Sequence, residues 1–186
     1  MHIRYNAPVS LSFSLACVII FILGILIPPL RELFVVPGGA AFSIARPLDW
    51  FRLVSYVAGH ASWDHLLGNL SFILLLGPVL EEKHGSQRLF AMMFITALVT
   101  GLVNVLFFST GLLGASGIVF MFILLVSITN IKSGEIPLSF ILVVTIYLLR
   151  EVVMGFHDDQ VARFAHLIGG ACGGMFGFAL ANRGRS

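Results

Sequence analysis

Charged side chains are the scarcest class in this sequence. Only 11% of its 186 residues are Asp, Glu, Lys or Arg, and 58% are hydrophobic, whereas soluble domains carry about 25% charged residues. A surface with so little charge is not suited to water, so the composition predicts a protein embedded in a lipid bilayer. The formal net charge of +2 is too small to predict nucleic acid as a partner.

Cysteine is nearly absent as well. Cys17 and Cys172 each lie in an apolar stretch, where we expect packing residues and no disulfide. The first apolar stretch is too long for the core of a signal peptide and no small-residue cleavage site follows it, so we expect no cleavable leader. With no low-complexity run or soluble appendage, the sequence predicts one membrane domain over residues 1–186.

Long apolar runs, in contrast, are plentiful. A helix needs about 20 apolar residues to cross a bilayer. The sequence predicts an all-α, polytopic bundle of six transmembrane helices at about residues 9–28, 63–80, 89–108, 116–129, 136–149 and 161–181. The connection at residues 30–62 has several aromatic side chains and few charges, so we expect a loop at the membrane interface. A plain extramembrane loop is the alternative.

The fourth predicted span is too short for a bilayer. Its 14 residues make about 21 Å of helix, against a hydrocarbon core of about 30 Å. The link before it, residues 109–114, is uncharged and can dip into the membrane where it is buried in protein or lines a water-filled cavity. We therefore expect Ser116 below the membrane surface, beside such a cavity.

Polar side chains gather at one end of the even-numbered spans. Spans two, four and six run in the same direction, so their N-terminal ends share one face of the membrane. His60, His65 and Asn69 lie at the start of span two, Ser116 begins span four, and His166 lies early in span six. Polar residues inside a membrane are costly and usually functional, so these five residues are expected to form a site.

Ser116 is the candidate nucleophile of that site. It lies between Gly114 and Gly117 at a loop-to-helix junction. Glycines permit close backbone approach, and the free N–H groups of a helix start can stabilise an oxyanion. His65 and Asn69, four residues apart, project from one helix face and supply two more donors. An ordinary helix-capping serine is the alternative.

His166 is the candidate general base. Gly169, Gly173 and Gly177 follow it on one helical face, and glycines at a spacing of four let two membrane helices touch along their backbones. Such a seam would bring a serine and a histidine on two helices within hydrogen-bond reach. Phe120, four residues after the serine, could stack on the imidazole. Ordinary small-residue packing beside a buried histidine is the alternative.

No metal or cofactor is predicted. His60 and His65 are five residues apart, unlike the pairs four apart of helical zinc sites, and no carboxylate lies at ligand spacing deep in a span. Asp158 and Asp159 precede the last span and have the character of helix caps. We therefore expect a serine–histidine dyad without an acidic third member.

Four motifs, taken in order, resemble the rhomboid family. Residues 51–69 are similar to its W-R and H-x(4)-H-x(3)-N signature, residues 81–86 to its E-x(3)-G-S turn, residues 114–117 to its G-x-S-G, and residues 165–173 to its A-H-x(2)-G-x(3)-G. The resemblance covers about residues 50–177. It implies a serine endopeptidase that cleaves other membrane proteins in or near their transmembrane segments, without metal or ATP.

The resemblance also implies a role for each matched residue. Ser116 would be the nucleophile and His166 the general base, while His65, Asn69 and the Ser116 backbone N–H would form the oxyanion hole. Supporting roles would fall to His60, Arg52, Glu81, Gly114, Gly117, Phe120, Gly169 and Gly173. The sequence departs from the family pattern at Trp50, displaced by one from the usual tryptophan, at Phe120, where tyrosine is frequent, and at Leu124 and Leu125, where small residues are frequent.

Two other functions stay open. A catalytically inactive rhomboid-like protein could bind membrane clients, although the presence of both Ser116 and His166 argues against it. A small transporter is disfavoured because the polar groups cluster at one face and not at the midplane. Neither the substrate nor the oligomeric state can be predicted from the sequence.

The distribution of basic residues predicts an orientation. With the N-terminus inside, six Lys and Arg residues lie inside and five outside, a thin margin under the positive-inside rule. We expect a multi-pass protein of a prokaryotic plasma (inner) membrane, with its N-terminus inside and its active site opening outward.

Overall fold

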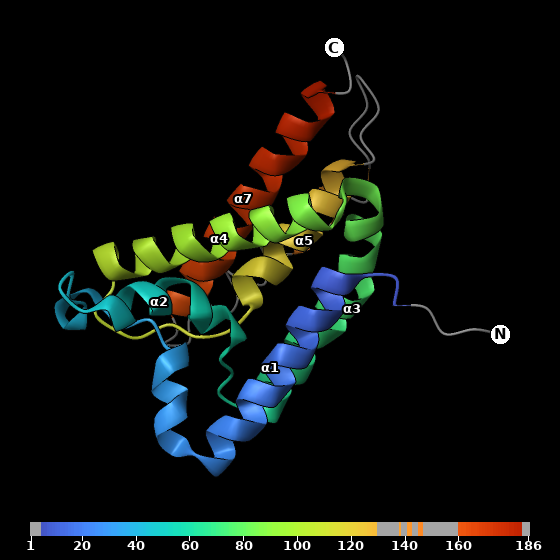
Figure 1. Ribbon diagram of the computed structural model, residues 1–186. Coiled ribbons are helices and arrows are strands. Elements are labelled where there is room, and N and C mark those ends of the chain that lie inside the picture. The colour runs from blue at the N-terminus through green and yellow to red at the C-terminus, as the bar shows by residue number, and fades with distance from the viewer. Residues whose placement is uncertain (1–4, 130–137, 139–140, 143–144, 147–159, 184–186) are drawn as a thin grey trace.

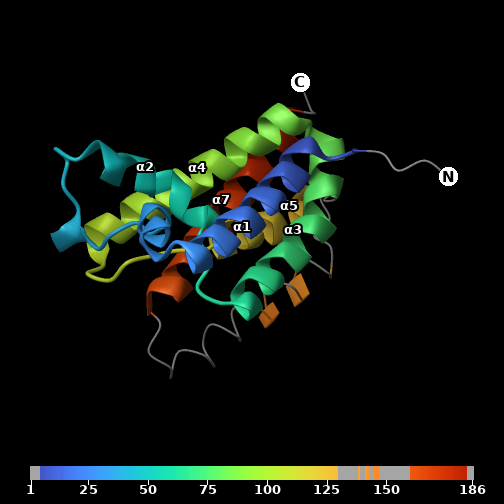
Figure 2. The same ribbon diagram turned by 60° about the horizontal axis from the view of Figure 1, so that its bottom comes forward.

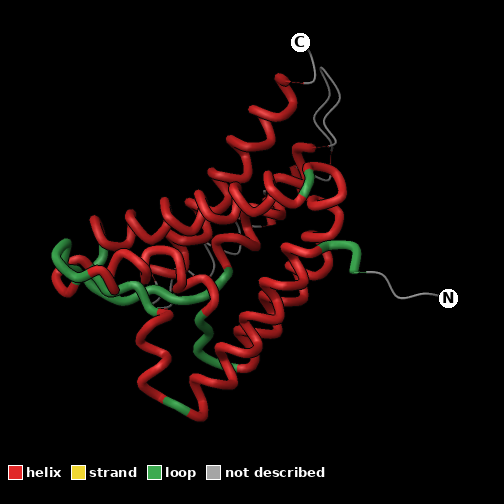
Figure 3. Tube along the Cα trace, viewed as in Figure 1, coloured by secondary structure: helices red, strands yellow, loops and turns green. Residues whose placement is uncertain are grey.

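The computed structural model describes residues 5–129, 138, 141–142, 145–146 and 160–183 (Figure 1). Its helices are α1 (Pro8–Leu26), η1 (Pro28–Phe34), η2 (Gly39–Ala41), α2 (Pro47–Ser55), η3 (Tyr56–Ala58), α3 (Trp63–His84), α4 (Ser86–Phe107), α5 (Ser116–Thr129) and α7 (Gln160–Arg183). Among these residues the only β pairing is one isolated bridge between Val36 and Leu112. The predicted all-α class is therefore confirmed, as the helix colouring of Figure 3 shows.

Three of the described helices, α1, α3 and α4, are long and apolar enough to cross a membrane, and α5 is a shorter apolar helix. Helix α5 has the bounds predicted for the fourth span. The predicted fifth span, residues 136–149, lies mostly outside the described residues, so the count of six spans stays a prediction.

Helix α3 extends one turn beyond the predicted second span, which ends at about residue 80. Helix α3 continues through the charged segment to His84, and its Glu81 is only 4% exposed. Glu81 accepts hydrogen bonds from the backbone N–H groups of Val9 and Ser10 (2.8 and 3.0 Å) and from the Ser10 hydroxyl (2.9 Å). A carboxylate is favourable at a helix start, so this charge caps α1 and does not end α3.

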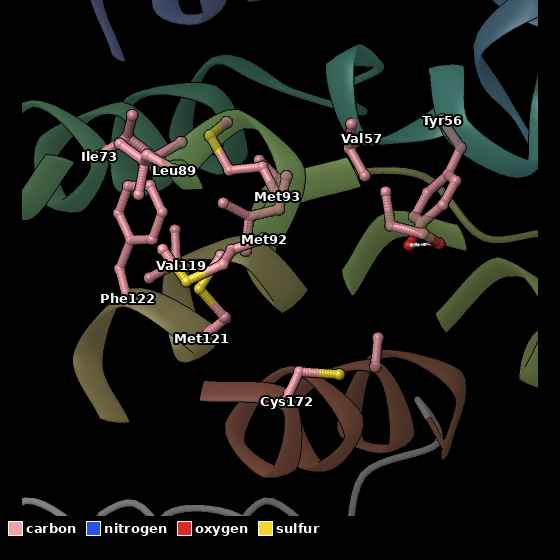
Figure 4. Packing of buried hydrophobic residues seen from close by; sticks show 14 of the residues in the cluster. Tyr56, Val57, Ile73, Leu89, Met92, Met93, Val119, Met121, Phe122 and Cys172 are labelled. Carbon is pink, nitrogen blue, oxygen red and sulfur yellow. Dashed lines mark hydrogen bonds between the residues drawn. The ribbon is translucent and has the colours of Figure 1, made fainter. Parts of the chain in front are cut away.

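Helix α5 lies at the centre of the described bundle. It packs against α3, α4 and α7, while α1 packs on α3 (Figures 1 and 2). In Figure 4, Phe122 of α5 points toward Ile73 of α3 and Leu89 of α4, and all three side chains are buried. Cys17 and Cys172 are buried free thiols, which confirms their prediction as packing residues. Helix α5, which begins at Ser116, is thus held by three neighbouring helices.

The connection at residues 30–62 contains more helix than the predicted loop. It holds η2, α2, η3 and most of η1. Its backbone is tied to the link before α5, because Val36 and Leu112 exchange both N–H···O bonds at 3.0 Å, and the Gly39 N–H donates to the Phe108 carbonyl at 2.8 Å. The connection therefore supports the chain that leads into α5. Its placement at the membrane interface stays a prediction.

Candidate active site

Ser116 begins α5 and is partly buried. The turn before it depends on Gly114, whose φ of 116° lies in a region that favours glycine. The Gly114 N–H donates to the Tyr56 carbonyl of η3 at 2.9 Å. This bond fixes the backbone two residues before the serine.

His65 lies directly against this turn. A Cβ atom placed on Gly114 would be 2.6 Å from both Cε1 and Nε2 of His65, so only a glycine leaves room for the imidazole. The histidine is held at the start of α3, where its backbone N–H donates to the Ser62 side chain at 3.2 Å. The structure thus brings His65 to the segment that carries Ser116.

Asn69 lies one turn further along α3. It is 7% exposed, and its Nδ2 is buried without an acceptor among the described residues. An unpaired buried donor is costly and needs an explanation. The unpaired Nδ2 would be explained if it binds a group that forms only during a reaction.

His166 lies in α7 and its ring contacts Phe120 of α5. The two ring centroids are 4.4 Å apart with an interplanar angle of 38°. Phe120 is 6% exposed, so the imidazole rests on a fixed aromatic surface. The carbonyl of the preceding residue, Ala165, lies 3.3 Å from a Cβ position on Gly117. The start of α7 therefore meets the first turn of α5, next to Ser116.

The predicted glycine seam between these two helices is confirmed. A Cβ on Gly169 would collide with the Gly117 carbonyl oxygen, and a Cβ on Gly173 would collide with that of Met121. A Cβ on Gly177 would be 2.7 Å from Cγ2 of Ile128. The backbones of α5 and α7 touch along this seam, so the position of His166 relative to α5 is set by main-chain contact.

The ring of His60 packs against the ring of His65. His60 is 3% exposed, and its ring centroid lies 5.1 Å from that of His65 in an edge-to-face arrangement. Burial, with a smaller contribution from His65, lowers the pKa of His60 to about 4. A neutral imidazole therefore packs against His65.

Arg52 lies in α2 and pairs with Asp49, at 3.0 Å. The Asp49 side chain is fully buried, pairs also with Arg46 at 3.0 Å and accepts a bond from the Ser43 N–H at 2.9 Å. Burial raises the pKa of Asp49, but the hydrogen bonds and the two arginines outweigh it and lower that pKa overall. This network holds the first connection together, and sequence reasoning missed its central carboxylate.

Two further residues beside the site were missed. The Tyr56 hydroxyl donates to the Ala97 carbonyl at 3.2 Å, and the Asn104 side chain donates to the Thr110 carbonyl at 3.2 Å. Both hold the surroundings of the serine through backbone acceptors, which no side-chain motif reveals. Asp49 had one available signal, its spacing of three residues from Arg52.

No group of three or more His, Cys, Asp and Glu side chains in the described part of the chain could hold a metal ion. The donors next to the turn that leads to Ser116 include the His65 imidazole and the backbone N–H groups at the start of α5. Such a set can stabilise a negative oxygen.

Comparison with known proteins places this chain in a family. The family model described as the rhomboid domain matches residues 47–183. The chain belongs to the rhomboid family. With three long apolar helices among its described residues, it is an integral membrane protein.

Two relatives illustrate the similarity. Rhomboid protease GlpG of Yersinia pestis (strain Pestoides F) is 24% identical over 174 residues, which cover 92% of this chain and 62% of that protein. The YdcA protein of Bacillus subtilis (strain 168) is 30% identical over 136 residues, which cover 68% of this chain and 65% of that protein. The chain spans less than two thirds of the length of either relative.

Proposed function

We propose that this rhomboid chain is an intramembrane serine endopeptidase that hydrolyses peptide bonds in or near transmembrane segments of other membrane proteins. The glycine seam between α5 and α7 carries the proposal, since it holds the start of α7, with His166, against the first turn of α5, which begins at Ser116. The protease named GlpG, similar over most of this chain, supports the same reaction class.

The reaction needs one nucleophile and one proton carrier. The Ser116 Oγ attacks the scissile carbonyl carbon while His166 takes the hydroxyl proton, which produces a tetrahedral oxyanion. Collapse of this intermediate breaks the C–N bond, and the amine leaves with the proton from His166. Water, deprotonated by His166, then hydrolyses the acyl-enzyme and regenerates Ser116.

Three donors would stabilise the oxyanion. The Ser116 backbone N–H lies at a helix start, and His65 lies against the turn before it. Asn69 supplies the buried amide that lacks an acceptor among the described residues. Loss of one such donor typically lowers kcat by about 10²–10³. The mechanism uses a serine–histidine dyad, and the contact with Phe120 helps to orient the imidazole.

The substrate must expose a carbonyl to this site. A helix within a membrane hides its carbonyls in internal hydrogen bonds, so a transmembrane segment has to unwind before Ser116 can attack. Small or helix-breaking residues near the cleavage site should therefore favour hydrolysis. The partners of this chain are thus transmembrane proteins and the bilayer around them.

Replacement of the nucleophile tests the proposal. Ser116→Ala should abolish cleavage of a model transmembrane substrate by the purified protein and abolish labelling by a fluorophosphonate. Ser127→Ala is the matched control, because Ser127 lies in the same helix and its hydroxyl donates to the Ile123 carbonyl at 2.7 Å. Undiminished cleavage by Ser116→Ala would rule out the mechanism. A wild-type chain that neither cleaves nor labels would favour a client-binding protein.

A further inference from the structure

Tyr56 holds the turn before Ser116 through its main chain. Its carbonyl oxygen accepts from the Gly114 N–H at 2.9 Å and from the Gly59 N–H at 3.0 Å. Only one residue, the fully buried Ala115, separates Gly114 from Ser116. The direction of the Ser116 N–H, a donor to the proposed oxyanion, therefore depends on where Tyr56 places its carbonyl.

Local structure alone does not fix this carbonyl. Tyr56 begins η3, a 3-10 helix of only three residues, and the hydrogen bonds of such short helices have poor geometry. The residue that follows η3 is Gly59, whose backbone is conformationally permissive. The position of η3 must therefore be set by contacts from outside this short segment.

The Tyr56 side chain makes such a contact with α4. Tyr56 is 2% exposed, and its hydroxyl donates to the Ala97 carbonyl at 3.2 Å, a bond drawn as a dashed line in Figure 4. A carbonyl inside a helix accepts one N–H from its own helix and keeps a second lone pair for another donor. The hydroxyl can therefore tie η3 to α4 without disturbing the helix.

The same part of α4 also contacts α2 and α5. A Cβ on Gly101 would lie 2.6 Å from the Leu53 carbonyl oxygen, so the backbone of α2 rests directly on α4 three residues before Tyr56. The neighbouring Thr100 lies beside the first turn of α5, with its Oγ1 3.7 Å from a Cβ position on Gly117. One turn of α4 thus locates both Tyr56 and the start of the helix that carries the proposed nucleophile.

We propose that the Tyr56 hydroxyl is a positioning group for the Ser116 N–H. Its bond to α4 keeps the carbonyl that binds Gly114 in place, and this aims the N–H at the oxyanion. The inference rests on the proteolysis proposed above. Because the oxyanion forms only along the reaction, a displaced N–H lowers kcat and leaves KM as it is in the wild type.

Tyr56→Phe removes the hydroxyl and keeps the buried ring. It should lower kcat about tenfold with KM unchanged, since a misplacement of about 1 Å can cost about 10² in rate and the loss of one hydrogen bond moves the turn by less. Ser55→Ala is the matched control, because the Ser55 hydroxyl donates to the Leu33 carbonyl of η1 at 2.7 Å and not to α4. Cleavage rates of a model transmembrane substrate are divided by the concentration of sites that a fluorophosphonate labels at completion, so unfolded molecules do not count.

A second variant acts on the same contact from α4. Gly101→Ala would force a Cβ against the Leu53 carbonyl oxygen and withdraw the Tyr56 hydroxyl from α4 without changing the tyrosine. It should lower kcat as well, and Tyr56→Phe should then lower kcat no further, because both changes remove one contact. Wild-type kcat in Tyr56→Phe, an equal loss in Ser55→Ala, a defect confined to KM, or additive losses in the double variant would each overturn this assignment alone. A wild-type chain that does not cleave would overturn the proposed proteolysis and this assignment with it.

Discussion

Asn69 provides the sharpest test at the scale of one residue. Its Nδ2 has no acceptor among the described residues, so Asn69→Ala should cost little stability yet lower kcat/KM by about 10². Asn104→Ala is the contrasting variant, because that side chain donates to the Thr110 carbonyl and its loss should lower the Tm. Cleavage rates and thermal unfolding of both variants provide the comparison. Wild-type turnover by Asn69→Ala would remove this residue from the site.

His60 makes stability depend on pH. Its pKa in the folded chain is about 4, whereas an unfolded histidine has a pKa of about 6.5. The unfolded state therefore binds more protons between these values, and stability falls as the pH drops from about 6.5 toward 4. His60→Ala should unfold at a lower temperature than wild type at pH 7.5 but lose less on acidification. Parallel pH profiles of Tm for the two proteins would contradict this assignment.

At the scale of helices, Glu81 links the end of α3 to the start of α1. Glu81→Ala removes three hydrogen bonds at a helix start and should lower the free energy of unfolding by about 2–4 kcal/mol. Glu82→Ala is the matched control, since the neighbouring carboxylate is exposed. Unfolding in mixed micelles of SDS and mild detergent measures both. Equal losses would show that the buried cap contributes no more than a surface charge.

The seam between α5 and α7 predicts a catalytic defect without any change in a reacting group. Even Gly173→Ala would force a Cβ against the Met121 carbonyl oxygen, and Gly173→Val adds more bulk, so the helices must separate. A misplacement of about 1 Å can cost about 10² in rate. Gly174→Ala is the control, because its Cβ would meet only Ile128 Cδ1 at 3.9 Å. Similar cleavage rates for the variants at 173 and 174 would contradict the role of the seam.

Some features of the helices were predictable because short-range sequence patterns mark them. Helix α5 follows a glycine turn and starts and ends where predicted, and the α5–α7 contact follows from glycines at a spacing of four. The first connection was less predictable, because η1, η2 and η3 are too short to show a periodic pattern. The partners of Glu81 were not predictable from local sequence, because Val9 and Ser10 lie beside it only once α1 packs on α3.

The partners of several residues around the site could not be predicted for a related reason. Tyr56, Asn104 and Gly114 bind backbone carbonyl groups, and every residue type offers the same carbonyl. Their pairing depends on how the whole chain folds, which no local motif records. The types of the proposed catalytic groups are visible in the sequence, whereas the contacts that position them depend on tertiary structure.

For the whole molecule, we propose that the N-terminus faces inward and the site opens outward. The native thiols, Cys17 and Cys172, are buried, so single introduced cysteines can report the orientation. Ile44→Cys, at a position 79% exposed in the first connection, should react with an impermeant maleimide on intact cells. Glu82→Cys, at the opposite end of α3, should react only after permeabilisation. The reverse pattern would show that the orientation is wrong.

The backbone bridge between Val36 and Leu112 has a consequence for isotope exchange. Both amides lie in connections, where hydrogen normally exchanges with deuterium within seconds, yet each donates to the other residue at 3.0 Å. Their exchange should require the two connections to separate, so both should retain hydrogen far longer than neighbours such as Ser109. A slow pair of amides outside the helices would therefore report, in real time, how often the chain beside Ser116 opens.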